Sequence, residues 1–135
     1  MKVVILAGGK GTRLAEFTRS IPKPMVPVGS KPILDHIIKY YMKFGFNDFI
    51  IASGYKHSII NNYFRNKKIS AKIEVINTGV ETLTGTRLKK LEDKLKRTFM
   101  LTYGDGLSNV NLKKLLYFHK KSKKKITLNT VHPPA

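Results

Sequence analysis

The chain opens, at residues 2–14, with the sequence KVVILAGGKGTRL. Its first part, Lys2–Leu6, is short, apolar and rich in β-branched residues, and it predicts a buried strand that glycine ends. Its second part, Ala7–Leu14, contains three glycines and predicts a loop that runs into a helical turn. This order of elements indicates an α/β fold with a parallel sheet.

The rest of the chain continues the alternation of strand and helix, which occurs four times in all. The prolines at 22, 24 and 27 predict extended backbone between the first strand and the first long helix. We expect helices between Ser30 and Gly45, at 56–65, around Leu88, Leu91 and Leu95, and at Asn111–Lys121, and strands at Asp48–Ser53, Lys72–Asn77, Thr98–Tyr103 and Ile126–Val131. This pattern predicts a three-layer α/β/α domain with a Rossmann-like, mostly parallel sheet.

Ligands of such sheets bind beyond the carboxyl ends of the strands. The loops that matter are therefore 7–14, 53–56, 78–86 and 104–106, and most of them carry glycines or a glycine beside an acid. The glycines and the acid of these loops are therefore expected at the edge of the sheet where this architecture has its binding sites.

Composition limits the class of protein. The chain has 135 residues, enough for one domain of residues 1–135, with 41% hydrophobic and 25% charged residues. Cysteine is absent, which excludes disulfides and thiolate chemistry. No apolar run has the length of a membrane span, and the first apolar run is too short for a signal peptide, so we expect a cytoplasmic protein without a membrane partner.

The net charge of +18 is unusually high. It indicates either an anionic partner or lysines that are spread over the solvent-exposed surface. Seven lysines lie between Lys113 and Lys125, where solvated helix faces explain them. The chain has no basic ribbon interleaved with aromatic residues and no zinc spacing, so we expect no nucleic-acid partner, although a basic nucleic-acid binder remains an alternative.

The glycine-rich loop fits neither of two common phosphate-binding motifs. A P-loop needs glycine at position 13, which is arginine, and a dinucleotide fingerprint needs glycine at position 14, which is leucine. Gly8, Gly9 and Gly11 can still turn backbone N–H groups toward a phosphate. A tight strand-to-helix turn without a ligand is the alternative.

Two further stretches carry candidate chemistry. In Pro22-Lys23-Pro24-Met25, two prolines restrict the backbone around one lysine and preorganise a cation suited to phosphate. In Tyr103-Gly104-Asp105-Gly106, an aspartate at a strand end can hold Mg²⁺ together with phosphate oxygens, or form an Asp-Gly turn. A third feature is the recurrence of Gly11-Thr12-Arg13-Leu14 as Gly85-Thr86-Arg87-Leu88, which suits an anion at both places. Asp35, in the first long helix, is interpreted as a surface or capping charge.

These motifs, in this order, resemble those of the sugar-1-phosphate nucleotidyltransferases, which join a nucleoside triphosphate to a sugar 1-phosphate. The resemblance covers residues 1–131 and is strongest for the branch that uses CTP and glucose 1-phosphate, through Glu16, the stretch 78–89 and the stretch 99–119. Thr86 stands where that branch has glycine, and the segment before Lys72 is shorter than in the branch. The resemblance implies that a C-terminal part with the sugar pocket and a second metal-binding aspartate is absent, so that the chain is truncated.

The resemblance also implies a site. Arg13 and Lys23 would stabilise the phosphates and Asp105 would hold Mg²⁺, which makes these three residues the catalytic candidates. The nucleotide would be bound by Leu6, Ala7, Gly8, Gly9, Lys10, Gly11, Thr12, Arg13, Lys23, Thr78, Leu83, Thr84, Gly85, Arg87 and Gly104. The implied reaction gives CDP-glucose and pyrophosphate for polysaccharide biosynthesis; the alternatives are the same chemistry with another nucleotide or sugar, or a nucleotide-binding module without turnover. A homo-oligomer is compatible with the resemblance.

Overall fold

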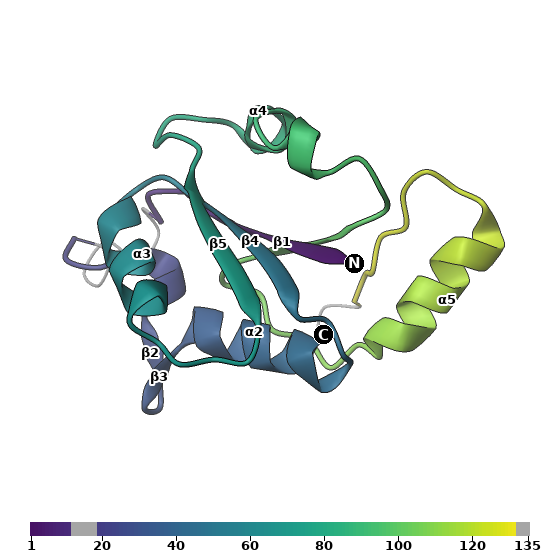
Figure 1. Ribbon diagram of the computed structural model, residues 1–135, viewed down its shortest axis with the longest axis horizontal. Helices are drawn as coiled ribbons and strands as arrows, with labels where there is room; N and C mark the ends of the chain where they lie inside the picture. The colour runs from purple at the N-terminus through teal and green to yellow at the C-terminus, as the bar shows by residue number, and fades with distance from the viewer. Residues whose placement is uncertain (12–18, 132–135) are drawn as a thin grey trace.

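The computed structural model describes residues 1–11 and 19–131. Its centre is a four-stranded parallel sheet in the order β5-β4-β1-β6, formed by β1 (Lys2–Ala7), β4 (Asp48–Ser53), β5 (Lys72–Asn77) and β6 (Met100–Tyr103). The register pairs Val3 with Phe49 and with Met100, so β1 lies at the middle of the sheet. The expected α/β/α architecture is confirmed (Figure 1).

The side chains of β1 alternate between two cores. Val3 and Ile5 pack into the larger core with α2 (Ile33–Lys43) and α3 (His57–Arg65), while Val4 and Leu6 pack into a smaller core with Leu91. In Figure 1, α2 lies below the sheet, α3 lies to the left of it and α4 (Thr84–Lys89) lies above it. Burial on both faces explains why β1 and β4 are continuous apolar runs rather than alternating ones.

The segment before α2 differs from its prediction. Lys23–Met25 forms a single 3₁₀ turn, η2, between the extended residues Pro22 and Val26, and Pro27–Val28 (β2) and Lys31–Pro32 (β3) form a small antiparallel hairpin. Proline fixes φ near a value that extended and 3₁₀ backbone share, so the prolines did not distinguish the two conformations. The helix after the hairpin ends as expected at Gly45, whose φ is +85°.

The helix expected around Leu88, Leu91 and Leu95 is broken into two short pieces. Helix α4 ends at Lys89, and the 3₁₀ turn η3 (Glu92–Lys94) follows, so Thr84 and Gly85 lie in the first turn of α4 rather than in a loop. A spacing of three and four residues is satisfied by successive tight turns as well as by a continuous helix.

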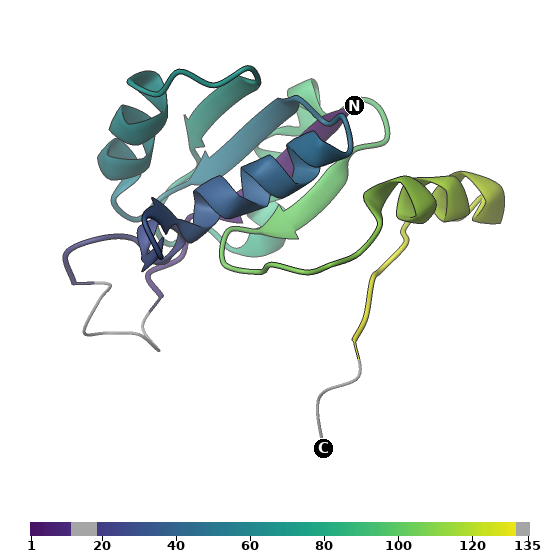
Figure 2. The ribbon, with the colours of Figure 1, turned by 90° about the horizontal axis from the view of Figure 1, so that it is seen from below.

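The strand expected at Ile126–Val131 is absent. Helix α5 (Leu112–Ser122) forms as predicted, with Asn111 as its N-cap, but residues 123–131 have no regular structure, and Ile126 and Leu128 are 75% and 80% exposed. Figure 2 shows α5 outside the sheet, with this segment leading away from it. The alternation of apolar residues is correct for a strand, but a strand also needs a partner, and within the described residues β6 pairs only with β1.

Among the helices that the structure describes, none has the length and apolarity needed to cross a membrane.

Candidate functional site

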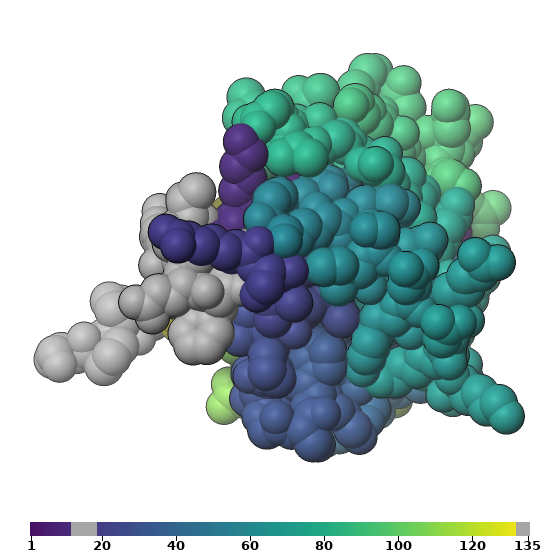
Figure 3. Space-filling model, turned by 90° about the vertical axis from the view of Figure 1, so that its left-hand side faces the viewer, coloured from purple at the N-terminus to yellow at the C-terminus, as the bar shows by residue number. Residues whose placement is uncertain are grey.

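The carboxyl ends of the parallel strands gather the candidate residues on one edge of the sheet. A cavity of about 400 Å³ opens there, lined by Leu6, Ala7, Gly8, Gly9, Gly11, Lys23, Pro24, Thr82, Leu83, Thr84, Arg87, Tyr103, Gly104 and Asp105. Figure 3 looks onto this edge, where the glycine loop (purple) stands between the α4 region (green) and the segment after residue 19 (dark blue). Segments from four separate parts of the chain therefore share one hollow.

The glycine loop enters this cavity directly from β1. The carbonyl of Gly8 accepts a hydrogen bond from the backbone N–H of Tyr55 (3.1 Å), which fixes the loop beside the end of β4. A Cβ at Gly8 would overlap the guanidinium of Arg87, whereas one at Gly9 would meet open space. Glycine is thus required at position 8 because the Arg87 guanidinium lies against it, whereas the backbone at Gly9 is open to the cavity.

Lys23 and Asp105 form an ion pair at the rim of the cavity. The Nζ of Lys23 lies 2.5 Å from Oδ2 of Asp105, and each side chain is 33% exposed. Lys23 begins the turn η2, in which Pro24 and Met25 are buried, so the backbone beneath this lysine is anchored in the core. The cation and the carboxylate predicted to act on phosphate are therefore brought together.

Gly104 holds Asp105 against β1. Its N–H donates to the carbonyl of Leu6 (2.8 Å), and a Cβ at this position would lie 3.0 Å from Cγ of Pro24. The strand end β6, the turn η2 and β1 are in contact at this point. Only glycine fits between them without displacing the segment that carries Lys23.

The loop after β5 forms the opposite wall. Lys10 of the glycine loop pairs with Glu81 across the opening, and Leu83 is 78% exposed at the wall's edge. Thr78 is 2% exposed and lies behind this wall, where its hydroxyl donates to the carbonyl of Ser53 (2.7 Å).

Arg87 occupies the floor of the cavity. It is 4% exposed, and burial lowers the pKa of its guanidinium from the usual value. Its hydrogen bonds all go to protein oxygens, namely the carbonyls of Ser53, Gly79 and Thr82 and the hydroxyl of Thr78.

Most of the predicted site residues therefore lie at one cavity, with five exceptions. Lys10 borders the cavity through Glu81, Thr78 lies behind its wall, and Gly85 lies in the first turn of α4. Thr12 and Arg13 lie outside the described residues. The roles assigned to all these residues stay predictions.

Sequence reasoning missed three lining residues, Pro24, Thr82 and Tyr103. Pro24 and Tyr103 belong to the motifs Pro22-Lys23-Pro24-Met25 and Tyr103-Gly104-Asp105-Gly106, in which the chemistry predicts a role for the charged residue alone. Thr82 carries no motif and could be found only from the fold.

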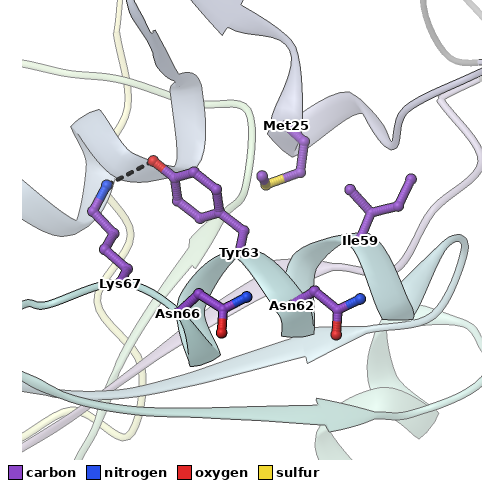
Figure 4. Close-up of a pocket in the computed structure, with 6 residues that line it drawn as sticks. All are labelled: Met25, Ile59, Asn62, Tyr63, Asn66 and Lys67. Carbon is purple, nitrogen blue, oxygen red and sulfur yellow. Dashed lines mark hydrogen bonds between the residues drawn. The ribbon is translucent and has the colours of Figure 1, made fainter.

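A second hollow lies away from the strand ends. It has a volume of about 620 Å³ and is lined by Met25, Ile59, Asn62, Tyr63, Asn66 and Lys67 (Figure 4). Lys67 donates to the Tyr63 hydroxyl (2.6 Å), and its Nζ lies 2.6 Å from Oδ1 of Asp35. Asp35 is fully buried, so its interpretation as a surface charge is wrong. No predicted site residue lines this hollow.

The described residues were tested for a metal site. Residues 1–11 and 19–131 contain no group of three or more histidine or acidic side chains that could hold a metal by themselves. Mg²⁺, however, is commonly held by one or two carboxylates together with substrate phosphates. Asp105, partly exposed at the cavity rim, fits that donor set once phosphate oxygens complete it.

Comparisons with known proteins agree with this geometry. The family model described as nucleotidyl transferase matches residues 2–134. The glucose-1-phosphate cytidylyltransferase of Salmonella typhimurium is 41% identical over 99% of this chain and 62% of its own length. A probable glucose-1-phosphate cytidylyltransferase of Bacillus subtilis is 43% identical over 88% of this chain and 56% of its own length.

Among solved structures, HddC from Yersinia pseudotuberculosis, complexed with GMP-PN, superposes with a TM-score of 0.74 and 30% identity. The match covers 87% of this chain and 53% of that one. The chain thus spans between half and two thirds of the length of these relatives.

Proposed function

The chain belongs to the nucleotidyl transferase family, and from this premise we propose that it transfers a nucleotidyl group from CTP to glucose 1-phosphate, giving CDP-glucose and pyrophosphate. The observation that carries the proposal is the contact between Lys23 and Asp105 at the rim of a glycine-lined cavity. It joins a fixed cation and a carboxylate at the place where a triphosphate would enter.

The chemistry needs little beyond such groups. A phosphate oxygen of the sugar 1-phosphate forms a bond to the α-phosphorus, the bond from that phosphorus to the bridging oxygen breaks, and pyrophosphate leaves. The nucleophile is already anionic near neutral pH, so no general base is required. Catalysis then depends on alignment and on neutralising charge as it moves toward the leaving group.

Two observations support this role for Lys23: the turn that carries it is anchored by the buried Pro24 and Met25, and Lys23 lines the cavity. Its charge is balanced by Asp105. When phosphates enter, the ammonium exchanges this partner for phosphate oxygens, and the carboxylate becomes available to a cation. Mg²⁺ held by Asp105 and the phosphates would supply Lewis acidity and neutralise negative charge.

The choice of CTP and glucose 1-phosphate follows the two relatives named as glucose-1-phosphate cytidylyltransferases. The alternative is the same chemistry with another base, because HddC was crystallised with GMP-PN. Base choice depends on the wall formed by Thr82, Leu83 and Thr84, where the exposed Leu83 offers an apolar surface to a base.

The direct test is incubation with CTP, glucose 1-phosphate and Mg²⁺ while pyrophosphate release is followed. We expect release that depends on all three components and that GTP or UTP supports less well. Faster pyrophosphate release with another nucleoside triphosphate would contradict the assignment of CTP and would identify that nucleotide as the substrate.

The chain covers only 62% and 56% of the lengths of the two cytidylyltransferases. The second candidate function is therefore a module that binds the nucleotide without turnover. Thermal stabilisation by CTP without pyrophosphate release would favour the module. DNA binding that salt weakens and CTP does not compete would contradict both candidates.

A further inference from the structure

Arg87 connects loops that follow three different strands. One terminal nitrogen, Nη1, donates to the carbonyl of Ser53 at the end of β4 (3.1 Å) and to the hydroxyl of Thr78 after β5 (2.5 Å). The same nitrogen donates to the carbonyl of Gly79 (2.9 Å), and Nη2 donates to the carbonyl of Thr82 (2.8 Å). Its guanidinium also lies against Gly8, so closely that a Cβ there would overlap it.

Lys90 secures the same loop from the next turn. Its Nζ donates to the carbonyl of Thr78 (2.9 Å) and to the hydroxyl of Thr82 (3.3 Å). The Thr82 hydroxyl in turn donates to the Thr78 carbonyl (2.6 Å). The segment 78–82 is not part of a strand. The side chains of Arg87, Lys90 and Thr82 therefore donate to backbone carbonyls of this segment that a neighbouring strand would otherwise satisfy.

The guanidinium is therefore occupied by the protein itself. Four oxygens of the fold accept its hydrogen bonds, and the residue is almost fully buried. A charged group held in this way costs much to redirect, because each carbonyl that it leaves would remain buried without a donor. Resemblance assigns Arg87 to the nucleotide, but the contacts show it turned toward the loops.

We propose that Arg87 is a positioning residue for the nucleotide: it holds the loop 78–84 in the place where this loop lines the cavity, and it does not bind phosphate. The inference rests on the proposed function, since it takes the cavity to be the nucleotide site. Arg87 then acts through Thr82, Leu83 and Thr84, the wall beside a bound base. A wall already fixed in place binds with less loss of conformational entropy than one that the ligand must order.

The two possible roles of Arg87 predict different changes in affinity along a series of cytidine nucleotides. If Arg87 bound a phosphate, its removal would weaken CTP more than CDP, and CDP more than CMP, because the charge of the ligand grows along that series. If Arg87 only orders the wall, its removal weakens cytidine, CMP, CDP and CTP by the same factor.

The experiment measures the affinity of these four ligands by calorimetry for the unaltered chain, Arg87→Met and Arg87→Lys. We expect a uniform loss on the order of tenfold for both variants, about the effect of ordering one or two side chains. Lysine does not restore binding, because one ammonium cannot reach four acceptors in a fork geometry. A loss that increases with each phosphate would overturn the proposal.

Lys89→Met is the matched control. It removes the same charge two positions away, where the ammonium pairs with Glu92 (2.5 Å) and is 73% exposed. We expect its affinities to equal those of the unaltered chain. Lys90→Met is the second variant if Arg87→Met does not fold, and it should give a smaller loss that is also equal for all four ligands.

Amide hydrogen exchange without nucleotide separates the inference from the proposed function. Arg87→Met should speed exchange at Thr78 and Gly79, whose N–H groups donate to Ser53 and Asn77, while β1 and α2 stay protected. Unchanged exchange at these amides would overturn the positioning role. If the unaltered chain binds none of the four ligands, the proposed function fails, and the exchange result still decides whether Arg87 holds the loops.

Discussion

The Nζ of Lys23 lies 2.5 Å from Oδ2 of Asp105, although the two residues belong to distant parts of the sequence. Lys23 is positioned by a 3₁₀ turn on one side of β1, and Asp105 follows β6 on the same edge of the sheet. Parallel strands that end at one edge place such pairs together, so the contact is a consequence of the topology. It also provides the first predictions.

Asp105→Asn should abolish the part of CTP binding that depends on Mg²⁺. The amide keeps the shape of the carboxylate but offers the cation no negative charge. The measurement is the ratio of CTP affinities with Mg²⁺ and with a chelator, which should fall to about one in the variant because the cation no longer contributes.

Asp93→Asn is the control for this change, since Asp93 is exposed in the turn η3 and away from the cavity. It should keep the full response to Mg²⁺. An undiminished response in Asp105→Asn would remove the metal role from this residue.

Lys23→Met should reduce pyrophosphate release strongly and stability little. One preorganised charge acting on the reacting phosphates contributes about 3 kcal/mol, or more than a hundredfold in rate. The lost ion pair with Asp105 is one-third exposed on each side, where such pairs stabilise a fold by less than about 1 kcal/mol.

Rate and thermal midpoint should therefore separate in this variant. Lys43→Met, at the exposed end of α2, is the control and should change neither. If Lys23→Met loses stability and activity in proportion, Lys23 serves the fold and not the reaction.

Gly104→Ala should destabilise the chain, whereas Gly106→Ala should not. A Cβ at Gly104 would lie 3.0 Å from Cγ of Pro24 and 3.2 Å from the Leu6 carbonyl oxygen, and a Cβ at Gly106 would meet nothing within 4 Å. Such overpacking costs about 1–3 kcal/mol. Urea unfolding of the two variants measures the difference, and equal stabilities would show that Pro24 moves aside freely.

The strands were the part of the fold that sequence could predict best. β1 and β4 are apolar runs that are buried on both faces, whereas β5, at the edge of the sheet, alternates polar and apolar residues and is only partly buried. Both patterns are typical of strands. Ile126–Val131 has the same local pattern but no partner strand among the described residues. Local pattern specifies the tendency to form a strand, and pairing decides whether it forms.

The candidate site shows the same division. Motif and resemblance predicted which residues gather at the cavity, since loop composition is a local property. They could not predict that Arg87 turns toward carbonyls of Ser53 and Gly79, because that choice depends on which loops pack beside it. Asp35 was likewise misjudged, because the lysine that neutralises it follows another helix.

The pair formed by Asp35 and Lys67 leads to the last prediction, on stability at high pH. Partial burial lowers the pKa of Lys67, but hydrogen bonds and charge from Asp35 and Tyr63 outweigh it and raise the pKa above 10.5. A group whose pKa is higher in the folded state stabilises the fold fully below its unfolded pKa, and this contribution is lost as pH rises through the folded pKa. The free energy of unfolding should therefore fall above about pH 10.5, where Lys67 begins to lose its proton in the unfolded chain.

Lys67→Met should remove that part of the alkaline loss. The variant should also be less stable near pH 8, by up to about 3 kcal/mol, because Asp35 stays buried and loses the nearer of its two ion-pair partners, keeping Lys39 at 3.5 Å. Lys68→Met, at the exposed neighbouring position, should keep the pH profile of the unaltered chain. Denaturant unfolding of the three proteins between pH 8 and pH 11.5 measures these slopes. If the Lys67→Met profile falls as steeply as the other two, the alkaline loss comes from the remaining lysines, and the contact with Asp35 contributes nothing to it.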